Sequence, residues 1–515
     1  MSEERASAYP IPDRWSHLWL AIGTVMGFFW TIPLVWWLSP ILMLRFMRTQ
    51  KVWRGFILVW LATVLTVGVT QYEMLNALMP SPLPVYLITV AVTALPYALP
   101  YLADRLLAPA LSSFASTLVF PLAVTAVDFL GARANPLGSI GANAYFQYGN
   151  LALMQLLAVT GMWGITFLVN WLGSTVNWAW KRDFNWSRIR QGATVYAGIL
   201  LAVVLFGSFR LAFAPPFTGT VRMHGITAVD MRQNWAALNE LKARKGWEAM
   251  REKTAEYHDL YFASTVREAR AGAQLIHWPE QAVMVPGEDE SAFIARAQEI
   301  ARQEGVYLTL AFGAVFQGGR PWENKLVVVD PAGDLVLEHH KYALAAMEGT
   351  KGGDGILRTV ETPFGTLSGI ICNDTNHEEA VAQAGRNGTD ILFAPSMEYR
   401  AIDPIHAHMA IYRAIENGVT VVRQADNGLS FVADPYGRVL AAVDHWTASE
   451  PVMLAQVPAN ASVFTLYPYV GDLFAWLALA GFLILTLLVI VRGRRARAGA
   501  PAQVRKSARH AQSPQ

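Results

Sequence analysis

The chain contains 515 residues; 53% are hydrophobic, only 16% are charged, and the formal net charge at pH 7 is +2. Because an average soluble domain has about 25% charged residues, this composition excludes a protein that is soluble along its whole length. The single cysteine excludes an intrachain disulfide framework.

Long tracts without Asp, Glu, Lys or Arg occupy both ends of the chain. They cover residues 15–44, 55–72, 106–127, 191–209 and 473–491, with two further tracts near 84–102 and 150–172. Each approaches the roughly 20 apolar residues that span a bilayer. The alternative, a set of buried core helices, would need a soluble fold that hides this many uncharged segments in its first 215 residues. We expect membrane helices, the first being an uncleaved anchor. That first tract fits either one long helix or a hairpin that turns near Pro33.

Basic residues between these tracts predict the orientation. Two basic loops contain Arg45, Arg48, Lys51 and Arg54, and Lys181, Arg182, Arg188 and Arg190, and an Arg-rich tail follows Val491. Loops and tails rich in Lys and Arg face the cytoplasm. The large region between the last two spans, about residues 217–469, is then extracytoplasmic. A DNA-binding arm is the alternative for the tail, but a basic tail beside a spanning helix is typical of a cytoplasmic flank, so no nucleic-acid partner is expected.

The region from 215 to 470 has ordinary charge density and alternates strand-like with helix-like segments. Strand-like runs rich in β-branched and aromatic residues cover 221–227, 273–278, 306–316, 324–330, 366–372, 390–395 and 419–425. Helical periodicity covers 237–270 and 290–305. The turns "DPAGD" and "DPYGR" separate further strand pairs. The pattern predicts one α/β domain.

Cys372 ends the strand "TLSGIIC" and opens into the polar loop "NDTNH". A side chain at a strand end is well placed for an active site. The alternative is a buried small hydrophobic residue, which is what most free cysteines are. A nucleophilic thiol needs a base and a group that stabilises an oxyanion.

Two other strand ends supply such groups. Glu280 follows the strand "LIH", next to Trp278 and Pro279. A carboxylate against Trp and Pro is partly desolvated and therefore better suited to accept a proton. Lys341 follows "LVLEHH", where its ammonium can stabilise an oxyanion. A surface glutamate and a solvated lysine are the alternatives for these two residues.

The order Glu280, Lys341, Cys372 resembles the carbon–nitrogen hydrolase (nitrilase) superfamily. The matching motifs are "WPE", "HHK" and "GIICND", and the stretch from 388 to 440 is also similar. The resemblance implies a four-layer αββα sandwich. Several membrane helices, this domain and one final helix together resemble the apolipoprotein N-acyltransferase family. That family's N-terminal hairpin favours the hairpin for the first tract, and so eight spans in all.

Three supporting residues follow from the resemblance. The family usually has an aromatic residue and a glutamate after the cysteine, where this chain has Asn373 and Asp374. Glu348, in "AAME", takes the place of the glutamate in the family's Pro-Phe-Gly-Glu segment. We expect it to orient Lys341 or to help deprotonate the incoming group, and we expect the backbone N–H of Asn373 to bind the oxyanion.

The resemblance divides the chain into four parts. These are a multi-span membrane domain (1–214), a nitrilase-like domain (215–470), a C-terminal transmembrane helix (471–491) and a basic cytoplasmic tail (492–515). The expected location is the inner (cytoplasmic) membrane, with the catalytic domain on its outer side. No cofactor is expected. The pairs His339–His340 and His406–His408 lack further ligands at metal-binding spacing, so no metal is expected.

The predicted activity is transfer of an acyl chain from phospholipid, through a thioester on Cys372, to the N-terminal amine of a diacylated apolipoprotein. One alternative is a membrane-anchored amidase or nitrilase-type hydrolase, in which water is the second nucleophile. A second alternative is a lipid-binding or transport protein with an inactive enzyme domain. Loss of Glu280, Lys341 or Cys372 would indicate that case, and all three are present.

Overall fold

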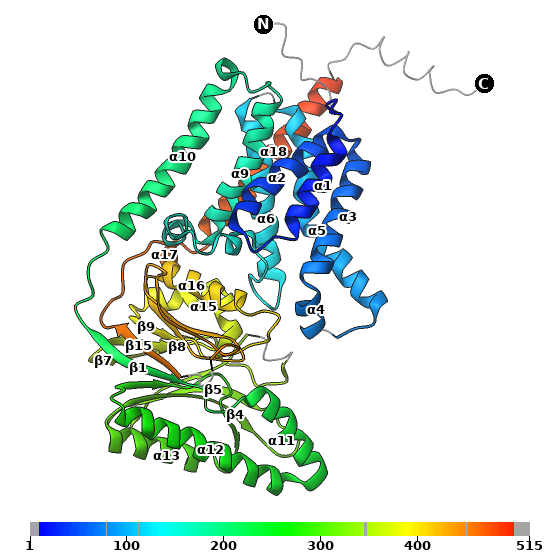
Figure 1. Ribbon diagram of the computed structural model, residues 1–515. Coiled ribbons are helices and arrows are strands. Elements are labelled where there is room, and N and C mark those ends of the chain that lie inside the picture. Colours follow the sequence, from blue (N-terminus) through cyan, green and yellow to red (C-terminus); the bar gives the residue numbers. More distant parts are fainter. Residues whose placement is uncertain (1–9, 79, 112, 344–347, 449–451, 499–515) are drawn as a thin grey trace.

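A computed structural model describes residues 10–78, 80–111, 113–343, 348–448 and 452–498. A bundle of long helices adjoins an α/β domain, and the chain leaves the bundle through α10 and returns to it through α18 (Figure 1). The predicted basic tail lies mostly outside the described residues, which end at Ala498.

The helical region contains both long and short helices. The long ones are α1 (Ser16–Gly27), α2 (Pro33–Thr49), α3 (Val52–Thr70), α5 (Leu83–Leu107), α6 (Val119–Ala134), α9 (Met162–Trp180), α10 (Trp186–Ala212) and α18 (Leu473–Ala498). The short ones are α4 (Tyr72–Leu78), η1 (Ala108–Ala110), η2 (Phe114–Leu118), η3 (Asn143–Gln147), α7 (Leu151–Met154) and α8 (Leu157–Thr160). Within the described residues, five helical segments are long and apolar enough to cross a membrane: Val52–Thr70, Leu83–Ala110, Phe114–Ala134, Trp186–Ala212 and Leu473–Arg495.

The first uncharged tract forms the hairpin, with α1 and α2 packed against each other. Pro33 begins α2, where its missing N–H is not needed and its fixed φ suits the first helical turn. With 12 residues, α1 is about 18 Å long, less than the roughly 30 Å of a hydrocarbon core. It is therefore too short to cross by itself.

Two predicted spans are displaced along the sequence. The span expected at 106–127 begins at Phe114, because α5 continues to Leu107 and a break separates it from the next helix. In the region where a span is expected at 150–172, the long helix is α9, which starts after Gly161 at a φ of +60° and is not among the five segments that are long and apolar enough to cross a membrane. Residues 151–160 form α7 and α8 instead. The absence of charged residues predicts that both regions are apolar, but it does not predict where the helices are interrupted.

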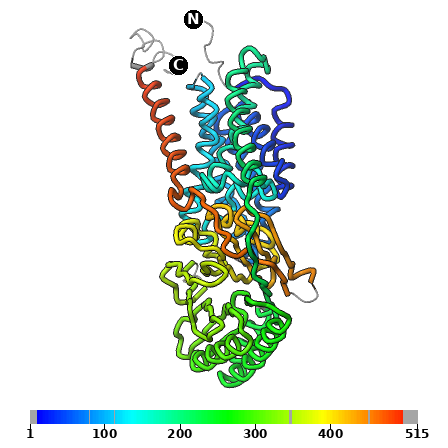
Figure 2. The backbone as a smooth tube through the Cα atoms, turned by 90° about the vertical axis from the view of Figure 1, so that its left-hand side faces the viewer, coloured from blue at the N-terminus to red at the C-terminus, as the bar shows by residue number. Residues whose placement is uncertain are grey.

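The basic loops lie at the end of the bundle that faces away from the α/β domain (Figure 1). Arg48 forms a buried, bidentate ion pair with Asp104 of α5, with distances of 2.8 and 2.9 Å. The Arg45 guanidinium lies 4.5 Å from the centroid of the Trp180 ring, at the end of α9. The C-terminal end of α18 reaches the same end of the bundle (Figure 2). The residues that predict a cytoplasmic face therefore gather on one side.

Two large mixed β-sheets form the core of the α/β domain, and β10 (Ser396–Met397) pairs with β12 (Ala425–Asp426) in a further two-stranded sheet. The first has the strand order β15-β1-β2-β4-β5-β6, with β3 paired to β4. Its strands are β1 (Thr220–Ile226), β2 (Leu275–His277), β3 (Met284–Pro286), β4 (Tyr307–Val315), β5 (Glu323–Val329), β6 (Leu335–His340) and β15 (Val452–Pro458). The second has the order β14-β13-β11-β9-β8-β7. Its strands are β7 (Thr359–Thr362), β8 (Gly365–Gly369), β9 (Ile391–Phe393), β11 (Thr420–Arg423), β13 (Leu429–Ala433) and β14 (Val439–Asp444).

The sheets pack face to face between two layers of helices, the arrangement that the resemblance implied. Leu326 of the first sheet and Phe393 of the second belong to the apolar core between them. On the outer face of the first sheet lie α11 (Met231–Lys245), α12 (Trp247–Arg270) and α13 (Glu290–Glu304) (Figure 1). The second sheet is covered by α15 (Glu378–Arg386) and α16 (Ile405–Asn417), which also share a core with α9.

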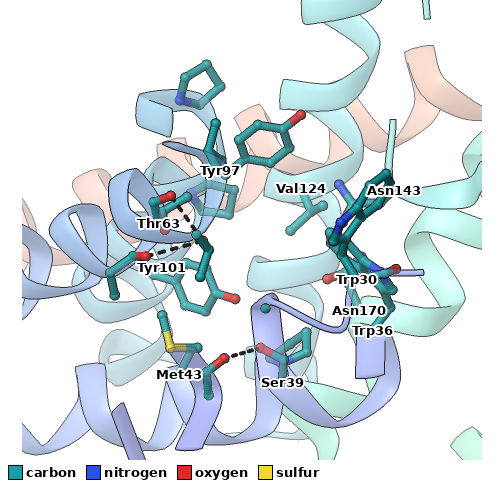
Figure 3. A pocket seen from close by; sticks show the side chains of 18 of the residues that line it. Trp30, Trp36, Ser39, Met43, Thr63, Tyr97, Tyr101, Val124, Asn143 and Asn170 are labelled. Atoms are coloured by element: carbon teal, nitrogen blue, oxygen red, sulfur yellow. Dashed lines mark hydrogen bonds between the residues drawn. The ribbon is translucent and has the colours of Figure 1, made fainter. Parts of the chain in front are cut away.

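A loop between α6 and η3 joins the bundle to the turn that carries Cys372. Asp128 of α6 fixes this loop by accepting hydrogen bonds from the backbone and side-chain nitrogens of Asn143, at 2.8–2.9 Å. Ser139 donates from both its N–H and its hydroxyl to the carbonyl oxygen of Asn376. Asn143 also lines a cavity of about 130 Å³ within the bundle, together with Trp36 (Figure 3). The helical bundle therefore contacts the turn that carries Cys372 directly.

Candidate active site

Cys372 is the first residue of the short helix η4 (Cys372–Asn376), which follows β8, and its backbone is strained. Its φ is +46°, in the left-handed region that residues other than glycine rarely adopt. Its N–H donates to the carbonyl oxygen of Pro395 at 2.9 Å. Its Sγ lies 3.9 Å from the carbonyl oxygen of Met397, and the residue is 7% exposed. Strain of this kind gathers at functional sites.

Glu280 lies in the loop after β2 and is buried among three donors. Its Oε1 accepts hydrogen bonds from Lys341 Nζ at 2.9 Å and from Asn324 Nδ2 at 2.7 Å. Its Oε2 accepts from the N–H of Met397 at 2.9 Å. Trp278, expected to shield the carboxylate, packs into the apolar core against Tyr261. Three hydrogen bonds therefore fix the orientation of this carboxylate.

Lys341 follows β6 and bridges two carboxylates. Its Nζ lies 2.9 Å from Glu280 Oε1 and 2.7 Å from Glu348 Oε1, and the side chain is 3% exposed. Burial alone lowers the pKa of Lys341, but the carboxylates of Glu280 and Glu348 outweigh it and hold that pKa well above its ordinary value. The side chain is thus a cation at neutral pH. Burial also raises the pKa of Glu348, and the ion pair with Lys341 opposes that effect.

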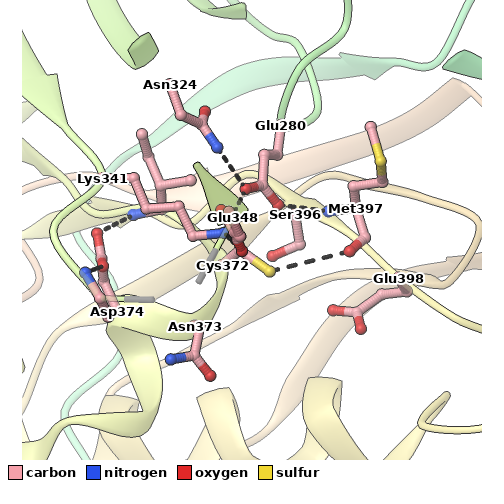
Figure 4. A network of polar contacts seen from close by, with 12 residues as sticks. Glu280, Asn324, Lys341, Glu348, Cys372, Asn373, Asp374, Ser396, Met397 and Glu398 are labelled. Carbon is pink, nitrogen blue, oxygen red and sulfur yellow. Dashed lines mark hydrogen bonds and ion pairs between the residues drawn. The ribbon is translucent and has the colours of Figure 1, made fainter. Parts of the chain in front are cut away.

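The Cys372 thiol is protonated in the resting site. Burial raises its pKa well above the ordinary thiol value, the Glu280 carboxylate raises it further, and Lys341 opposes both. A thiolate must therefore form as its proton is removed, which requires a base nearby. Figure 4 shows Glu280, Lys341 and Cys372 converging from three different chain segments. The structure brings together the three residues that the sequence singled out.

The supporting residues stabilise the geometry of the turn. Asp374, which is fully buried, accepts hydrogen bonds from the N–H groups of Ile371 at 3.2 Å and Ala343 at 2.8 Å. His339 Nε2 lies 3.1 Å from the same carboxylate. Asp374 therefore connects the turn that carries Cys372 to the segment that carries Lys341. The side-chain amide of Asn373 donates to the carbonyl oxygen of Pro136, in the loop from the bundle, at 3.4 Å.

The sequence did not point to Asn324, Glu398 or Arg423, and it suggested His406 only as a metal ligand. Asn324 lies at the start of β5 and contacts Glu280 only because β5 pairs with β6. One ligand-type atom each from Cys372, Glu398 and His406 lie within 4.8 Å of one another. Arg423 is ion-paired with Glu398, and its positive charge disfavours a metal ion there. The second histidine of the H-x-H pair, His408, instead stacks on Tyr148.

A second cavity, of about 480 Å³, lies where the helical region meets the α/β domain. Glu73 and Ala77 of α4 form one side of it, and residues 399–401 form another. This loop directly follows Glu398 in the chain. The cavity therefore adjoins the segment that contacts Cys372.

Comparison with known proteins agrees with this architecture. Residues 225–463 match the carbon–nitrogen hydrolase family. The chain is 23% identical over 390 residues to the apolipoprotein N-acyltransferase of Geobacter metallireducens, covering 69% of this chain and 70% of that protein. It is 20% identical over 314 residues to that of Rickettsia typhi, covering 56% and 60%.

Among solved structures, an amidase from Nesterenkonia sp. is 17% identical, covering 48% of this chain and 93% of the amidase, with a TM-score of 0.36. With the family match and the two acyltransferase relatives, residues 225–463 form a carbon–nitrogen hydrolase domain, and the chain as a whole is similar to the apolipoprotein N-acyltransferases.

Proposed function

We propose that this protein is a membrane-bound N-acyltransferase that moves an acyl chain from a phospholipid to the N-terminal amine of a diacylated lipoprotein. The observation that carries the proposal is the buried contact of Lys341 with Glu280 beside Cys372. The similarity to apolipoprotein N-acyltransferases and the apolar helices support the substrates. The proposed location is the inner membrane, with the α/β domain outside the cytoplasm. The proposed α/β domain begins at residue 215, the C-terminal transmembrane helix at 471 and the basic tail at 492.

The first half-reaction forms a thioester. Glu280 accepts the proton of the Cys372 thiol, and Sγ attacks the ester carbonyl carbon of the phospholipid. Lys341 and the N–H of Asn373 stabilise the oxyanion; one such preorganised donor is typically worth about 2.7–4 kcal/mol. The ester C–O bond then breaks, the leaving oxygen takes the proton from Glu280, and a lysophospholipid departs.

The second half-reaction transfers the acyl chain to nitrogen. The amine attacks the thioester carbonyl carbon, the C–S bond breaks, and Cys372 regains a proton through Glu280. Glu348 keeps the Lys341 ammonium in place through their 2.7 Å contact.

The rate at which the acyl group leaves the enzyme distinguishes an acyltransferase from a hydrolase. The full-length protein in nanodiscs is acylated with phospholipid, separated from excess lipid, and followed by intact mass with and without a diacylated N-terminal cysteine peptide. We expect the adduct to persist alone and to discharge onto the peptide. Equal loss in both samples, with only free fatty acid released, would identify a membrane-anchored amidase-type hydrolase.

A further inference from the structure

A second group of buried ionisable residues lies beside Cys372. Glu398 follows β10 (Ser396–Met397), His406 lies in the first turn of α16, and Arg423 ends β11. Their exposed fractions are 1%, 3% and 0%. Cys372, Glu398 and His406 each contribute one sulfur, oxygen or nitrogen atom to a group of three atoms that lie within 4.8 Å of one another. The thiol therefore has an imidazole–carboxylate pair near it in addition to Glu280.

The hydrogen bonds define which nitrogen of His406 is free to act as a base. Nδ1 lies 2.8 and 3.1 Å from the two oxygens of Glu398, so it carries the proton and donates it to the carboxylate. Arg423 Nη2 lies 3.1 Å from Nδ1 but also contacts Glu398 Oε1, the acceptor that suits a guanidinium. Nε2 of His406 is buried and has no hydrogen-bond partner within the described part of the chain. A buried acceptor without a partner is costly and calls for an explanation.

The charges around His406 suit a base that gains a proton. Burial alone raises the pKa of Glu398, but His406 and Arg423 together lower it below its ordinary value, so Glu398 is a carboxylate at neutral pH. A carboxylate behind an imidazole orients the ring and stabilises the imidazolium. Arg423, Asp403 and Cys372 are the other ionisable groups around this pair. Glu280 and Glu398 approach the thiol from different directions (Figure 4).

The proposed transfer needs two bases, because the acceptor amine arrives as an ammonium. An N-terminal amine has a pKa of about 7.7–8.0, so most of it carries three protons at neutral pH. The amide product keeps one of them. Glu280 can take one proton and return it to the Cys372 thiolate. The other proton needs a second acceptor. Glu348 Oε2 and His406 Nε2 are both buried without a hydrogen-bond partner in the described part of the chain, but Glu348 holds the Lys341 ammonium through its Oε1 and the imidazole does not.

We propose that His406, oriented by Glu398, is the base that deprotonates the acceptor ammonium in the second half-reaction; this inference rests on the proposed function. The ammonium N–H bond breaks, and the proton moves to Nε2 of His406. The neutral amine then attacks the thioester carbonyl carbon, and its second proton moves to Glu280. The C–S bond breaks, the thiolate takes the proton from Glu280, and the imidazolium releases its proton to water. The first half-reaction does not need His406.

The test measures the two half-reactions separately for His406→Asn in the full-length protein. Asparagine can keep a donor near Glu398 but has no group equivalent to Nε2. Acylation by phospholipid should stay within about threefold of the wild type. Discharge onto the peptide amine should fall by about 60-fold at pH 6, the ratio of total to free amine for a pKa of about 7.8. The defect should vanish above about pH 9, where the amine is already neutral.

Two controls separate this role from a structural one. Hydroxylamine is neutral at neutral pH, so it should discharge the variant acyl-enzyme at the wild-type rate. His408→Asn, on the same helix but stacked on Tyr148, should leave both half-reactions unchanged. If His406→Asn slows acylation and both discharges equally at every pH, the residue is structural and the inference is wrong. If the wild type forms no adduct with phospholipid, the proposed function itself fails.

Discussion

Cys372 and Glu280 are coupled through charge, and this coupling gives opposite predictions for two reactions of the same thiol. Glu280→Gln keeps the shape of the side chain but removes both its charge and its ability to accept a proton. Acylation by phospholipid should fall by about 10²–10⁴-fold, the usual effect of a positioned acid–base group. Rates of adduct formation by intact mass measure this.

Alkylation by iodoacetamide should change in the other direction. The Glu280 carboxylate raises the pKa of the Cys372 thiol, so removing its charge lowers that pKa and increases the thiolate fraction at any given pH. Glu280→Gln should therefore be alkylated faster than the wild type while it is acylated more slowly. Glu299→Gln, on the exposed surface of α13, should change neither rate. Slower alkylation together with slower acylation would make Glu280 a structural residue.

Among the contacts between elements, the most informative one joins the helical bundle to the turn that carries Cys372. Gly138 has a φ of +65°, and a Cβ there would lie 2.4 Å from the carbonyl oxygen of Asn376. Gly138→Ala should therefore displace η4, lower the melting temperature and slow acylation. Overpacking of this kind typically costs about 1–3 kcal/mol.

Gly149→Ala is the matched control for this substitution. Gly149 also has a positive φ, +90°, but a Cβ there would meet nothing within 4 Å. Gly149→Ala should therefore strain the backbone as Gly138→Ala does, but its Cβ would not clash with a neighbouring residue. Thermal unfolding and acylation should both be affected more by Gly138→Ala. Equal effects of the two substitutions would show that the loop between α6 and η3 does not stabilise the turn that carries Cys372.

Much of the α/β domain could be predicted because its strands are locally encoded. The seven strand-like runs correspond to β1, β2, β4, β5, β8, β9 and β11. Lys341 directly follows β6, as the sequence predicts, whereas Glu280 lies three residues beyond β2, and Cys372 begins η4 three residues beyond β8 instead of ending the strand. Asn324 and the Glu398–His406–Arg423 group could not be predicted, because strand pairing and the packing of α16 bring them to the site from distant segments. The helix breaks near Pro109 and Gly161 were missed because lack of charge does not report on backbone conformation.

At the scale of the whole molecule, the basic residues predict that the two ends of the long axis face different compartments. The chain has one cysteine, so Cys372→Ala provides a cysteine-free background. Gln317→Cys introduces an exposed thiol in the turn between β4 and β5, and Ser187→Cys introduces one beside the second basic loop. In intact spheroplasts of a bacterial host, a membrane-impermeant maleimide should label the first. The second should be labelled only after permeabilisation. Labelling of both from the same side would overturn the orientation.

Intact mass spectrometry shows directly whether Cys372 carries an acyl chain taken from phospholipid. The purified full-length protein is incubated with phospholipids of one defined acyl chain and then weighed intact. We expect the mass of the wild type to increase by that acyl group, the increase to be removed by hydroxylamine, and no increase in Cys372→Ala. An unchanged wild-type mass, or the same adduct in Cys372→Ala, would contradict this expectation.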